Sequence, residues 1–482
     1  MNLHPNFVVA ILIHFAIPPN ISLAATWYVN DDSSGNNNGT SWTDAFNDLQ
    51  DGLAAANSGD QVWVAAGVYV PGATESDTFH LKNGVEIYGG FEGFPGTEGD
   101  FNVRDFETFV TVLSGDIDGD DMTNPNGIVT LADNVVGENT HHIVTGSGID
   151  STALLDGFIV TAGAAGSGFQ QDHSGGGMHI LGGSPTLTNL IFYGNSANYG
   201  GGLYNDQNSS PSLTNVVFSN NKARVGGGGG MHSVNDSSPT LFNVDFLNNE
   251  SGFMGGGMYI YLDGLSTLTN VTFTGNTAHI GGGLSILYSG ITLTNAIFMG
   301  NSASNAGGGL YDESDTSTLT DVVFANNEAE HFGGGMSTGG FGSHALFNVI
   351  FLKNIAGSNG GGMSTSAGTS FMNVMFTANH AAEDGGGLYN TGDATLANVS
   401  FSCNSAGENG GGIFNHGIPN LANVTFSGNA AGIAGGRFFN AHPPVGPTST
   451  SSGLNCRVEF SEFDAGVVGC KAPVDPLSLC VS

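Results

Sequence analysis

A motif of about 25 residues recurs through most of the chain and constrains its fold more than any other feature. Aligned on the phenylalanine of "LTNVTF", the copies are spaced by 25 to 28 residues. Repeats at such a spacing are typical of solenoids, in which each repeat is one supersecondary unit that stacks on its neighbours. The aligned phenylalanines are Phe192, Phe218, Phe246, Phe273, Phe298, Phe324, Phe351, Phe376, Phe401 and Phe426.

Each copy reads L-T-N-V-x-F-x-x-N-x-A, followed by a short spacer and G-G-G-[LM]. Leu, Val and Phe alternate with polar residues, which indicates a strand with one buried face. The glycine triplet excludes a helix, because glycine costs about 1 kcal/mol per residue in a helix interior. We therefore predict an all-β parallel β-helix, and the family resemblance described below implies that it is right-handed. Its core would contain one row of phenylalanines and a second row of the Leu or Met that follows the glycines.

An asparagine follows each phenylalanine by three residues, and Asn or Asp also precedes it by three. Asparagine tolerates a left-handed backbone, and its amide can bond to the asparagine of the next coil. We interpret the recurring asparagines as turn formers that build a structural ladder, with a ligand role as the alternative. The predicted ladder is Asn195, Asn221, Asn249, Asn276, Asn301, Asn327, Asn354, Asn379, Asn404 and Asn429.

The pattern is looser before the regular repeats. "VWVAAGVYV", "GVEIYGGF", "VTVLSGDI", "HHIVTGSG" and "LLDGFIVTAG" are typical of strands in irregular coils. Before them, Phe46, Leu49 and Leu53 share one helical face and predict a short helix that caps the solenoid. The predicted organisation is a signal peptide (1–24), an N-terminal cap (25–60), irregular coils (61–155), regular repeats (156–440) and a linker with a cysteine-containing tail (441–482).

The chain is acidic, with 42 Asp and Glu against 8 Lys and Arg, and its net charge is −34. Such a charge repels the phosphates of nucleic acids, so we expect no nucleic-acid partner. It suits a protein that is soluble in salt or that meets divalent cations. No cofactor is required by any motif, and the rod is expected to be a monomer.

The N-terminal run "FVVAILIHFAI" precedes "PPNISLAA", in which Ser22 and Ala24 fit the small-residue positions of a signal-peptide cleavage site. No later stretch approaches the roughly 20 apolar residues of a membrane helix, so we expect a secreted or cell-surface protein without a transmembrane segment. Four cysteines allow three disulfide connectivities, and free thiols are the alternative. They are Cys403, Cys456, Cys470 and Cys480.

The paired F-x-x-N and G-G-G-[LM] motifs resemble the F-x-x-N and G-G-A-[ILV] repeats of polymorphic outer membrane proteins and related bacterial β-helix surface proteins. The resemblance covers roughly residues 156–440 and implies adhesion. The stretch that begins "WYVNDDSSGNNNGTSWTDAFNDLQ" is similar to the start of secreted proteins of the pectate-lyase-like superfamily. That group includes polysaccharide lyases and hydrolases, so this resemblance implies an enzyme as an alternative.

Acidic side chains give two candidate cation sites. "SGDIDGDDMTNPNG" carries carboxylates at alternating positions, as Ca²⁺ ligands often do, although the EF-hand spacing is not met. In the spacers of two successive repeats, glutamates at equal positions would stack about 5 Å apart and form a cation-attracting edge. The Ca²⁺ candidates are Asp116, Asp118, Asp120 and Asp121, and the edge candidates are Glu383, Asp384 and Glu408.

Outward aromatic residues after the glycines give a candidate carbohydrate surface, at Tyr204, Tyr259, Tyr311 and Tyr389. Basic residues, which a lyase acting on acidic sugars would need, are scarce in the repeats, and Lys222 with Arg224 is the one close pair. The sequence therefore predicts a secreted or surface protein with a structural or adhesive, carbohydrate-contacting role. The alternative is a lyase or glycoside hydrolase acting on an acidic polysaccharide.

Overall fold

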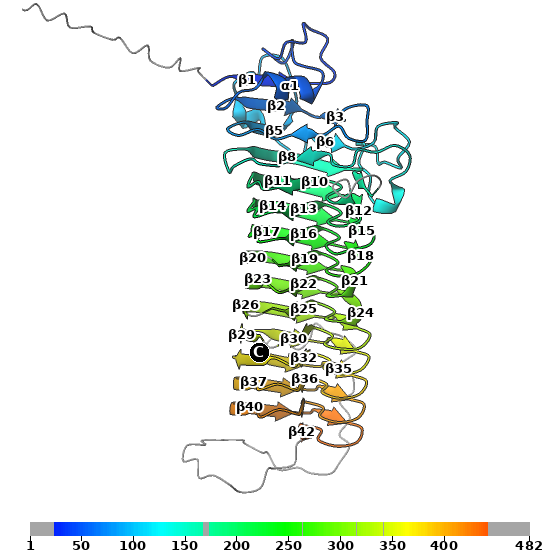
Figure 1. Cartoon of the computed structure of the whole chain (residues 1–482), viewed down its shortest axis with the longest axis vertical. Helices are drawn as coiled ribbons and strands as arrows, with labels where there is room; N and C mark the ends of the chain where they lie inside the picture. The colour runs from blue at the N-terminus through cyan, green and yellow to red at the C-terminus, as the bar shows by residue number, and fades with distance from the viewer. Residues whose placement is uncertain (1–23, 167–172, 263, 315, 341, 442–482) are drawn as a thin grey trace, which may run out of the picture.

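A computed structural model describes residues 24–166, 173–262, 264–314, 316–340 and 342–441. The chain forms an all-β parallel solenoid, and its coils stack in sequence order into one rod (Figure 1). Residues 1–23 of the predicted signal peptide, and the tail from residue 442, lie outside the described residues. No helix in the described ranges is long and apolar enough to cross a membrane.

Three parallel sheets run along the rod. The largest has 18 strands, and equivalent residues of successive coils pair in register, with Phe192 opposite Phe218 and Phe218 opposite Phe246. Its strands are β1 (Thr26–Val29), β2 (Gln61–Ala65), β3 (Gly67–Tyr69), β5 (Glu86–Phe91), β6 (Thr111–Ser114), β8 (Leu154–Thr161), β11 (Thr186–Tyr193), β14 (Ser212–Ser219), β17 (Thr240–Leu247), β20 (Leu265–Thr274), β23 (Gly290–Met299), β26 (Thr316–Ala325), β29 (Ser343–Phe347), β30 (Ile350–Leu352), β33 (Gly368–Met372), β34 (Met375–Thr377), β37 (Thr395–Ser402) and β40 (Asn420–Ser427).

The second sheet has 13 strands, and from β10 to β39 each begins at the residue after a glycine triplet. Its strands are β4 (Phe79–His80), β7 (Val144–Thr145), β10 (Met178–Leu181), β13 (Leu203–Asp206), β16 (Met231–Val234), β19 (Met258–Tyr261), β22 (Leu284–Leu287), β25 (Leu310–Glu313), β28 (Met336–Thr338), β32 (Met363–Thr365), β36 (Leu388–Asn390), β39 (Ile413–Asn415) and β42 (Phe438–Asn440).

The third sheet has 11 short strands, formed by the residues just after the inner asparagine of each repeat. They are β9 (Ala164–Ala165), β12 (Ser196–Ala197), β15 (Lys222–Ala223), β18 (Glu250–Ser251), β21 (Thr277–Ile280), β24 (Ser302–Ala306), β27 (Glu328–Ala329), β31 (Ile355–Ala356), β35 (His380–Ala381), β38 (Ser405–Ala406) and β41 (Ala430–Ala431).

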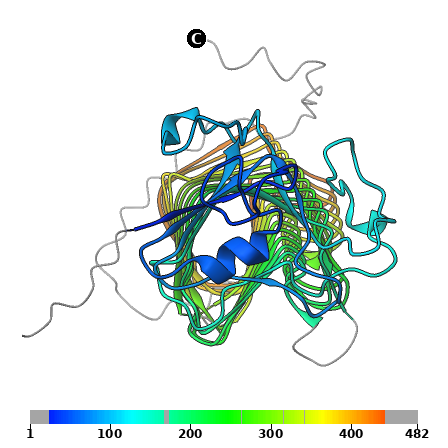
Figure 2. The ribbon, with the colours of Figure 1, turned by 90° about the horizontal axis from the view of Figure 1, so that it is seen from above.

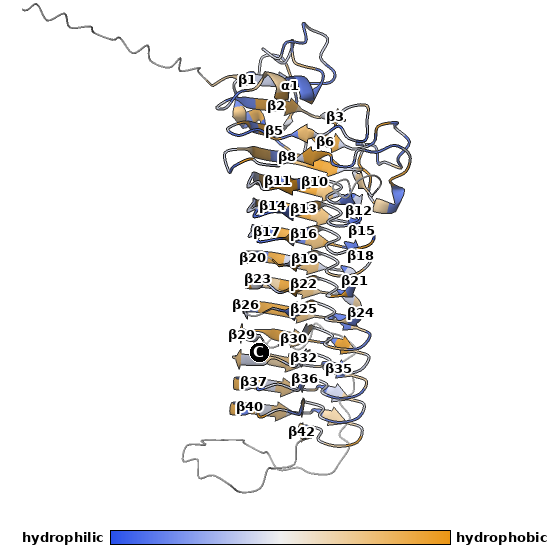
Figure 3. Ribbon diagram, viewed as in Figure 1, coloured by the Kyte–Doolittle hydropathy of each residue, from blue (hydrophilic) through white to orange (hydrophobic). Residues whose placement is uncertain are grey.

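The core consists of stacked rows of like side chains. The phenylalanine rings of successive coils lie 4.7 to 5.2 Å apart, and each is fully buried up to the last coils. The Leu or Met after the glycines, such as Met231, Leu284 and Leu310, forms the opposite wall of the core. Figure 3 shows the apolar residues concentrated in the strands of the two larger sheets.

The asparagines form two ladders with different jobs. The inner ladder consists of ten asparagines, of which all but the last are buried: Asn195, Asn221, Asn249, Asn276, Asn301, Asn327, Asn354, Asn379, Asn404 and the partly buried Asn429. Each amide Nδ2 in it, up to Asn404, donates to the Oδ1 of the next coil at 2.9 to 3.0 Å. The same Nδ2 also donates to a main-chain carbonyl of the preceding coil, as Asn276 does to Phe246 O at 2.9 Å. Burial is tolerated because every amide is paired.

The outer ladder lies on the surface and runs in the opposite direction. Its members are Asp156, Asn189, Asn215, Asn243, Asn270, Asn295, Asp321, Asn348, Asn373, Asn398 and Asn423. Their Nδ2 atoms donate to the preceding coil, as Asn270 does to Asn243 Oδ1 at 3.0 Å, and the bond between Asn295 and Asp321 is missing because Asp321 has no amide.

The left-handed backbone that we expected of the ladder asparagines belongs to the outer ladder and not to the inner one. The outer asparagines have φ of 50° to 57°, whereas no inner asparagine has a positive φ. The residue just before each inner asparagine takes that conformation instead, for example Asn248 or Gly275. One asparagine therefore turns the chain and the other bonds the coils together.

The middle glycine of each triplet is required by a close approach of two coils. A Cβ at Gly256 would lie 2.4 Å from Gly282 O and 2.5 Å from Thr277 O. Both oxygens belong to the main chain and cannot swing aside, so a side chain would force neighbouring coils apart.

The N-terminal region contains the helix α1 (Leu49–Ala55) and the short 3-10 helices η1 (Phe101–Val103) and η2 (Ala132–Asn134). The Asp48 side chain accepts a hydrogen bond from Gln50 N at 2.8 Å and begins α1, while Leu49 and Leu53 are buried. Phe46, which the sequence placed on the same helical face, lies before the helix and bridges to Val29. Figure 2 shows α1 in the view along the rod.

Arg104 fixes the N-terminal end of the outer ladder. Its guanidinium donates to both carboxylate oxygens of Asp156, at 2.7 and 3.2 Å, and to Gly89 O at 2.6 Å. Asp156 in turn accepts from Asn189 Nδ2 at 2.8 Å. The pair is largely buried, which makes it sensitive to the loss of either partner.

Candidate functional site

The candidate site is built on one row of side chains on the outer face of the 13-stranded sheet. Each residue follows the inward Leu or Met of its coil, and pairing places the members opposite one another in successive strands. This outer row is His179, Tyr204, His232, Tyr259, Ser285, Tyr311, Ser337, Ser364, Tyr389, Phe414 and Phe439.

The N-terminal part of the outer row is a column of rings. His179 lies 5.5 Å from Tyr204, Tyr204 lies 5.2 Å from His232, and His232 lies 4.7 Å from Tyr259, measured between ring centroids. His142 stacks on His179 at 4.8 Å and extends the column toward the N-terminus. The sequence predicted the tyrosines here but not the histidines, although these occupy the same position after Met178 or Met231.

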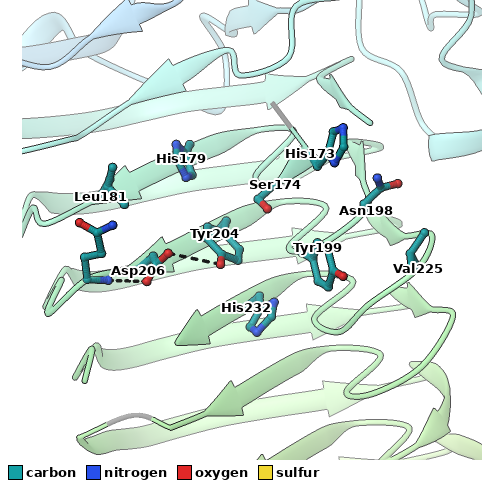
Figure 4. Close-up of a pocket in the computed structure, with 11 residues that line it drawn as sticks. His173, Ser174, His179, Leu181, Asn198, Tyr199, Tyr204, Asp206, Val225 and His232 are labelled. Atoms are coloured by element: carbon teal, nitrogen blue, oxygen red, sulfur yellow. Dashed lines mark hydrogen bonds between the residues drawn. The ribbon is translucent and has the colours of Figure 1, made fainter. Parts of the chain in front are cut away.

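A hollow of about 460 Å³ lies against this column, and we call it the upper hollow. It has the size of a small-molecule site, and aromatic and polar groups are mixed in its wall. Figure 4 shows His179, Tyr204 and His232 on adjacent strands with Tyr199 beside them. The lining residues are His173, Ser174, His179, Leu181, Asn198, Tyr199, Tyr204, Asp206, Gln207, Val225 and His232.

A second hollow of about 350 Å³ lies farther along the same row, and we call it the lower hollow. Ser337 and Ser364 occupy two successive positions of the outer row between Tyr311 and Tyr389. The small serines leave room between the two rings, and Phe332 closes one side. Two aromatic rings about 14 Å apart, three coil rises, thus flank a polar floor.

Burial and nearby carboxylates keep the tyrosine hydroxyls of the row protonated. Burial, and next the charge of Asp206, raises the pKa of Tyr204, and its hydroxyl donates to Asp206 Oδ2 at 3.4 Å. Burial, and next the charge of Glu313, raises the pKa of Tyr311, and its hydroxyl donates to Glu313 Oε2 at 3.0 Å. The row therefore presents ring faces and fixed polar groups together.

The Ca²⁺ candidates converge in part. Asp116, Asp118 and Asp120 can each place one carboxylate oxygen within 4.8 Å of the others, and two of the three are exposed. Desolvation, and next the adjacent Asp118 carboxylate, raises the pKa of Asp120. Asp121 lies apart from this group, because its oxygens accept from Val136 N at 2.6 Å and from Asn139 Nδ2 at 2.8 Å.

Asp121 is instead a buried structural carboxyl. It is 8% exposed, and burial raises its pKa to about 6. The three converging carboxylates have the hard oxygen chemistry that Ca²⁺ prefers.

The two glutamates of the predicted cation edge lie in neighbouring coils, as their spacing indicated, and Glu408 N donates to Glu383 O at 2.8 Å. Asp384 Oδ1, however, accepts from Asn409 N and Nδ2, both at 3.0 Å. Across the part of the chain that the structure describes, the aspartates of "DIDGD" are the one set of three ligands that converges, so Glu383, Asp384 and Glu408 do not form such a set.

The basic pair that a lyase would need is divided between two environments. Lys222 Nζ lies 3.0 Å from Asp133 Oδ1 and 3.3 Å from Glu250 Oε2, so carboxylates already neutralise its charge. Arg224 lines a smaller recess of about 220 Å³ together with Glu75. Neither side chain lines the upper or the lower hollow.

Comparison with known proteins supports the fold and leaves the activity open. The family model described as "Right handed beta helix region" matches residues 166–328, which contain the lining of the upper hollow but only part of the lining of the lower hollow. Together with the parallel solenoid, this match identifies the architecture as a right-handed parallel β-helix. No curated protein matches the chain.

Proposed function

We propose that this right-handed β-helix is an extracellular protein that binds carbohydrate along the outer row, in a structural or adhesive role. The observation that carries the proposal is the run of aromatic side chains beside two hollows on one face of the rod. Sugar rings stack on aromatic faces, and their hydroxyls bond to fixed polar groups of the kind that line both hollows. Two hollows on one straight row of the rod suit an extended polymer better than a small metabolite.

Export to the cell exterior, activity as a monomer and a cap formed by α1 are parts of the same proposal. The apolar segment before Ser22 supports export. The buried Leu49 and Leu53 support the cap, because they place α1 against β1, β2 and β4 at the first coil. Ca²⁺ at Asp116, Asp118 and Asp120 would brace the loop beside the first coils.

The enzyme alternative draws no specific support from the geometry. A lyase for acidic polysaccharides would place a basic group and a cation at the bound sugar. Lys222 is held by two carboxylates, and the converging aspartates do not line either hollow. Incubation with acidic polysaccharides and analysis of the products tests this alternative directly.

The proposal is tested with a glycan array and the full-length protein. We expect binding that is lost in the double variant Tyr311→Ala, Tyr389→Ala, because both rings border the lower hollow. The matched control is Tyr193→Ala, a partly buried tyrosine on β11 of the 18-stranded sheet. No glycan binding, or binding unchanged in the double variant, would refute the proposal for this row.

A further inference from the structure

The upper hollow contains a buried imidazole that the fold does not satisfy. His232 on β16 is 5% exposed and lines the hollow. Neither Nδ1 nor Nε2 of this ring has a hydrogen-bond partner among the described residues. The ring meets Tyr204 edge-on and Tyr259 at a tilt, with centroids 5.2 and 4.7 Å away.

The fold itself does not need a histidine at this position. Ser285, Ser337 and Ser364 occupy the same place in the outer row of later coils without disturbing the register. A buried polar group without a partner is costly, and the cost disappears when a ligand supplies the missing bonds. The unpaired nitrogens of His232 therefore point to a ligand in the upper hollow, which would reach them by a turn of the ring, because both nitrogens are closed off from solvent in this structure.

The imidazole is uncharged at neutral pH. Burial lowers the pKa of His232 to about 3, so one ring nitrogen is a donor and the other is an acceptor. A hydroxyl group can donate or accept, so a ligand with several hydroxyls satisfies both nitrogens. A carboxylate could satisfy only the donor.

The rest of the wall also disfavours an anion. None of the lining residues is Lys or Arg, and the Asp206 side chain faces the hollow as a carboxylate. Asp206 Oδ1 accepts from Gln207 N at 2.6 Å and from Asn235 Nδ2 at 2.7 Å, which fixes it in place. Tyr199 is 38% exposed and offers a ring face at the rim.

We propose that the upper hollow binds one uncharged sugar unit, with its hydroxyls on His232 and its ring face on Tyr199. The inference rests on the proposed carbohydrate-binding function and narrows its ligand class. Asp206 and the net charge of −34 disfavour acidic sugars at this position. Acidic polysaccharides were the substrates expected for the enzyme alternative.

The test is calorimetric titration of the full chain with neutral and uronic acid oligosaccharides of equal length. We expect the neutral series to bind more tightly than the uronic acid series, and His232→Phe to weaken neutral binding about tenfold or more, because a bound hydroxyl loses its partner. His232→Gln, which keeps a donor and an acceptor, should restore part of the affinity. His279→Phe is the control, since His279 is half-buried, lies outside the hollow and bonds to Ser304 Oγ at 2.8 Å.

A structural role for His232 would give a different result. Since the nitrogens of His232 have no partner, the variant His232→Phe should melt at the same temperature as the wild type or higher. A lower melting temperature together with unchanged affinity for the oligosaccharide would overturn the inference. Equal or tighter binding of the uronic acid oligomers would also overturn it. If Tyr311→Ala, Tyr389→Ala removes binding and His232→Phe does not, the proposed function stands and this inference fails. No binding to any oligosaccharide refutes both.

Discussion

Removing one amide of the inner ladder should destabilise the rod far more than removing one of the outer ladder. Asn276 is fully buried, and its side chain takes part in four hydrogen bonds. It accepts from Asn249 N and Nδ2 at 2.9 and 3.0 Å, and it donates to Asn301 Oδ1 and Phe246 O at 3.0 and 2.9 Å. Asn276→Ala leaves these buried groups short of partners, and at roughly 1 kcal/mol per bond the free energy of unfolding should fall by about 4 kcal/mol.

The matched control lies in the same coil. Asn270 makes two exposed side-chain bonds, to Asn243 and from Asn295, and its φ is 55°. Asn270→Gly removes those bonds but keeps the left-handed backbone accessible, so the loss should stay below about 1 kcal/mol. Urea denaturation measures both losses, and hydrogen exchange of the Asn249 amide reports the local opening. Equal losses in the two variants would refute the division of roles between the ladders.

Three further predictions concern a glycine, a histidine and the acidic loop. Gly256→Ala should lower the free energy of unfolding, measured by urea denaturation, by about 3 kcal/mol, because its Cβ meets backbone oxygens. Gly300→Asn should lower it by less than about 0.5 kcal/mol, because Gly300 has φ 64° and open space around it. Similar losses in the two variants would contradict the packing argument. His232 is protonated in the unfolded chain below about pH 6.5 but in the folded protein only near pH 3. The free energy of unfolding of the wild type should therefore fall relative to that of His232→Phe by about 1.4 kcal/mol per pH unit between pH 6 and 4. Parallel curves of unfolding free energy against pH for the two proteins would contradict this. Ca²⁺ at tenfold its Kd should stabilise the protein by about 1.4 kcal/mol in thermal melting, and Asp118→Asn should abolish the gain; a melting temperature that chelator does not change would remove the site.

The core could be predicted from the sequence because its signal is repeated. Alternation around Phe273 specifies which side chains face inward, and the 25-residue spacing specifies which residues stack. The division of labour between Asn270 and Asn276 could not be predicted, because both are asparagines at regular spacing. Only the backbone geometry shows that one has a positive φ and the other is buried among amides.

The candidate site was predictable where residue types repeat and hidden where they do not. Tyr311 and Tyr389 share a position after the inward Leu, and that register placed them in one row. His232 has the same register, but a lone histidine carries no spacing signal, and its unpaired state depends on the rings that pack around it. The role of Asp384, in contrast, can be read from the sequence. Asn359 and Asn409 lie 25 residues before and after it, and this spacing indicates a third short ladder, which the structure contains.

The two asparagine ladders also make the length of the rod an adjustable quantity. Nearly all their bonds join a coil to the coil before or after it, and Asn379, Asn404 and Asn429 are chemically equivalent stations along that path. Excising residues 379–403, which include Asn398, would bring Asn404 into the place of Asn379 and leave Asn423 to donate to Asn373, the partner that Asn398 has now. A chain of this design can therefore gain or lose reach in whole coils of 25 residues, while both ladders close again over the cut.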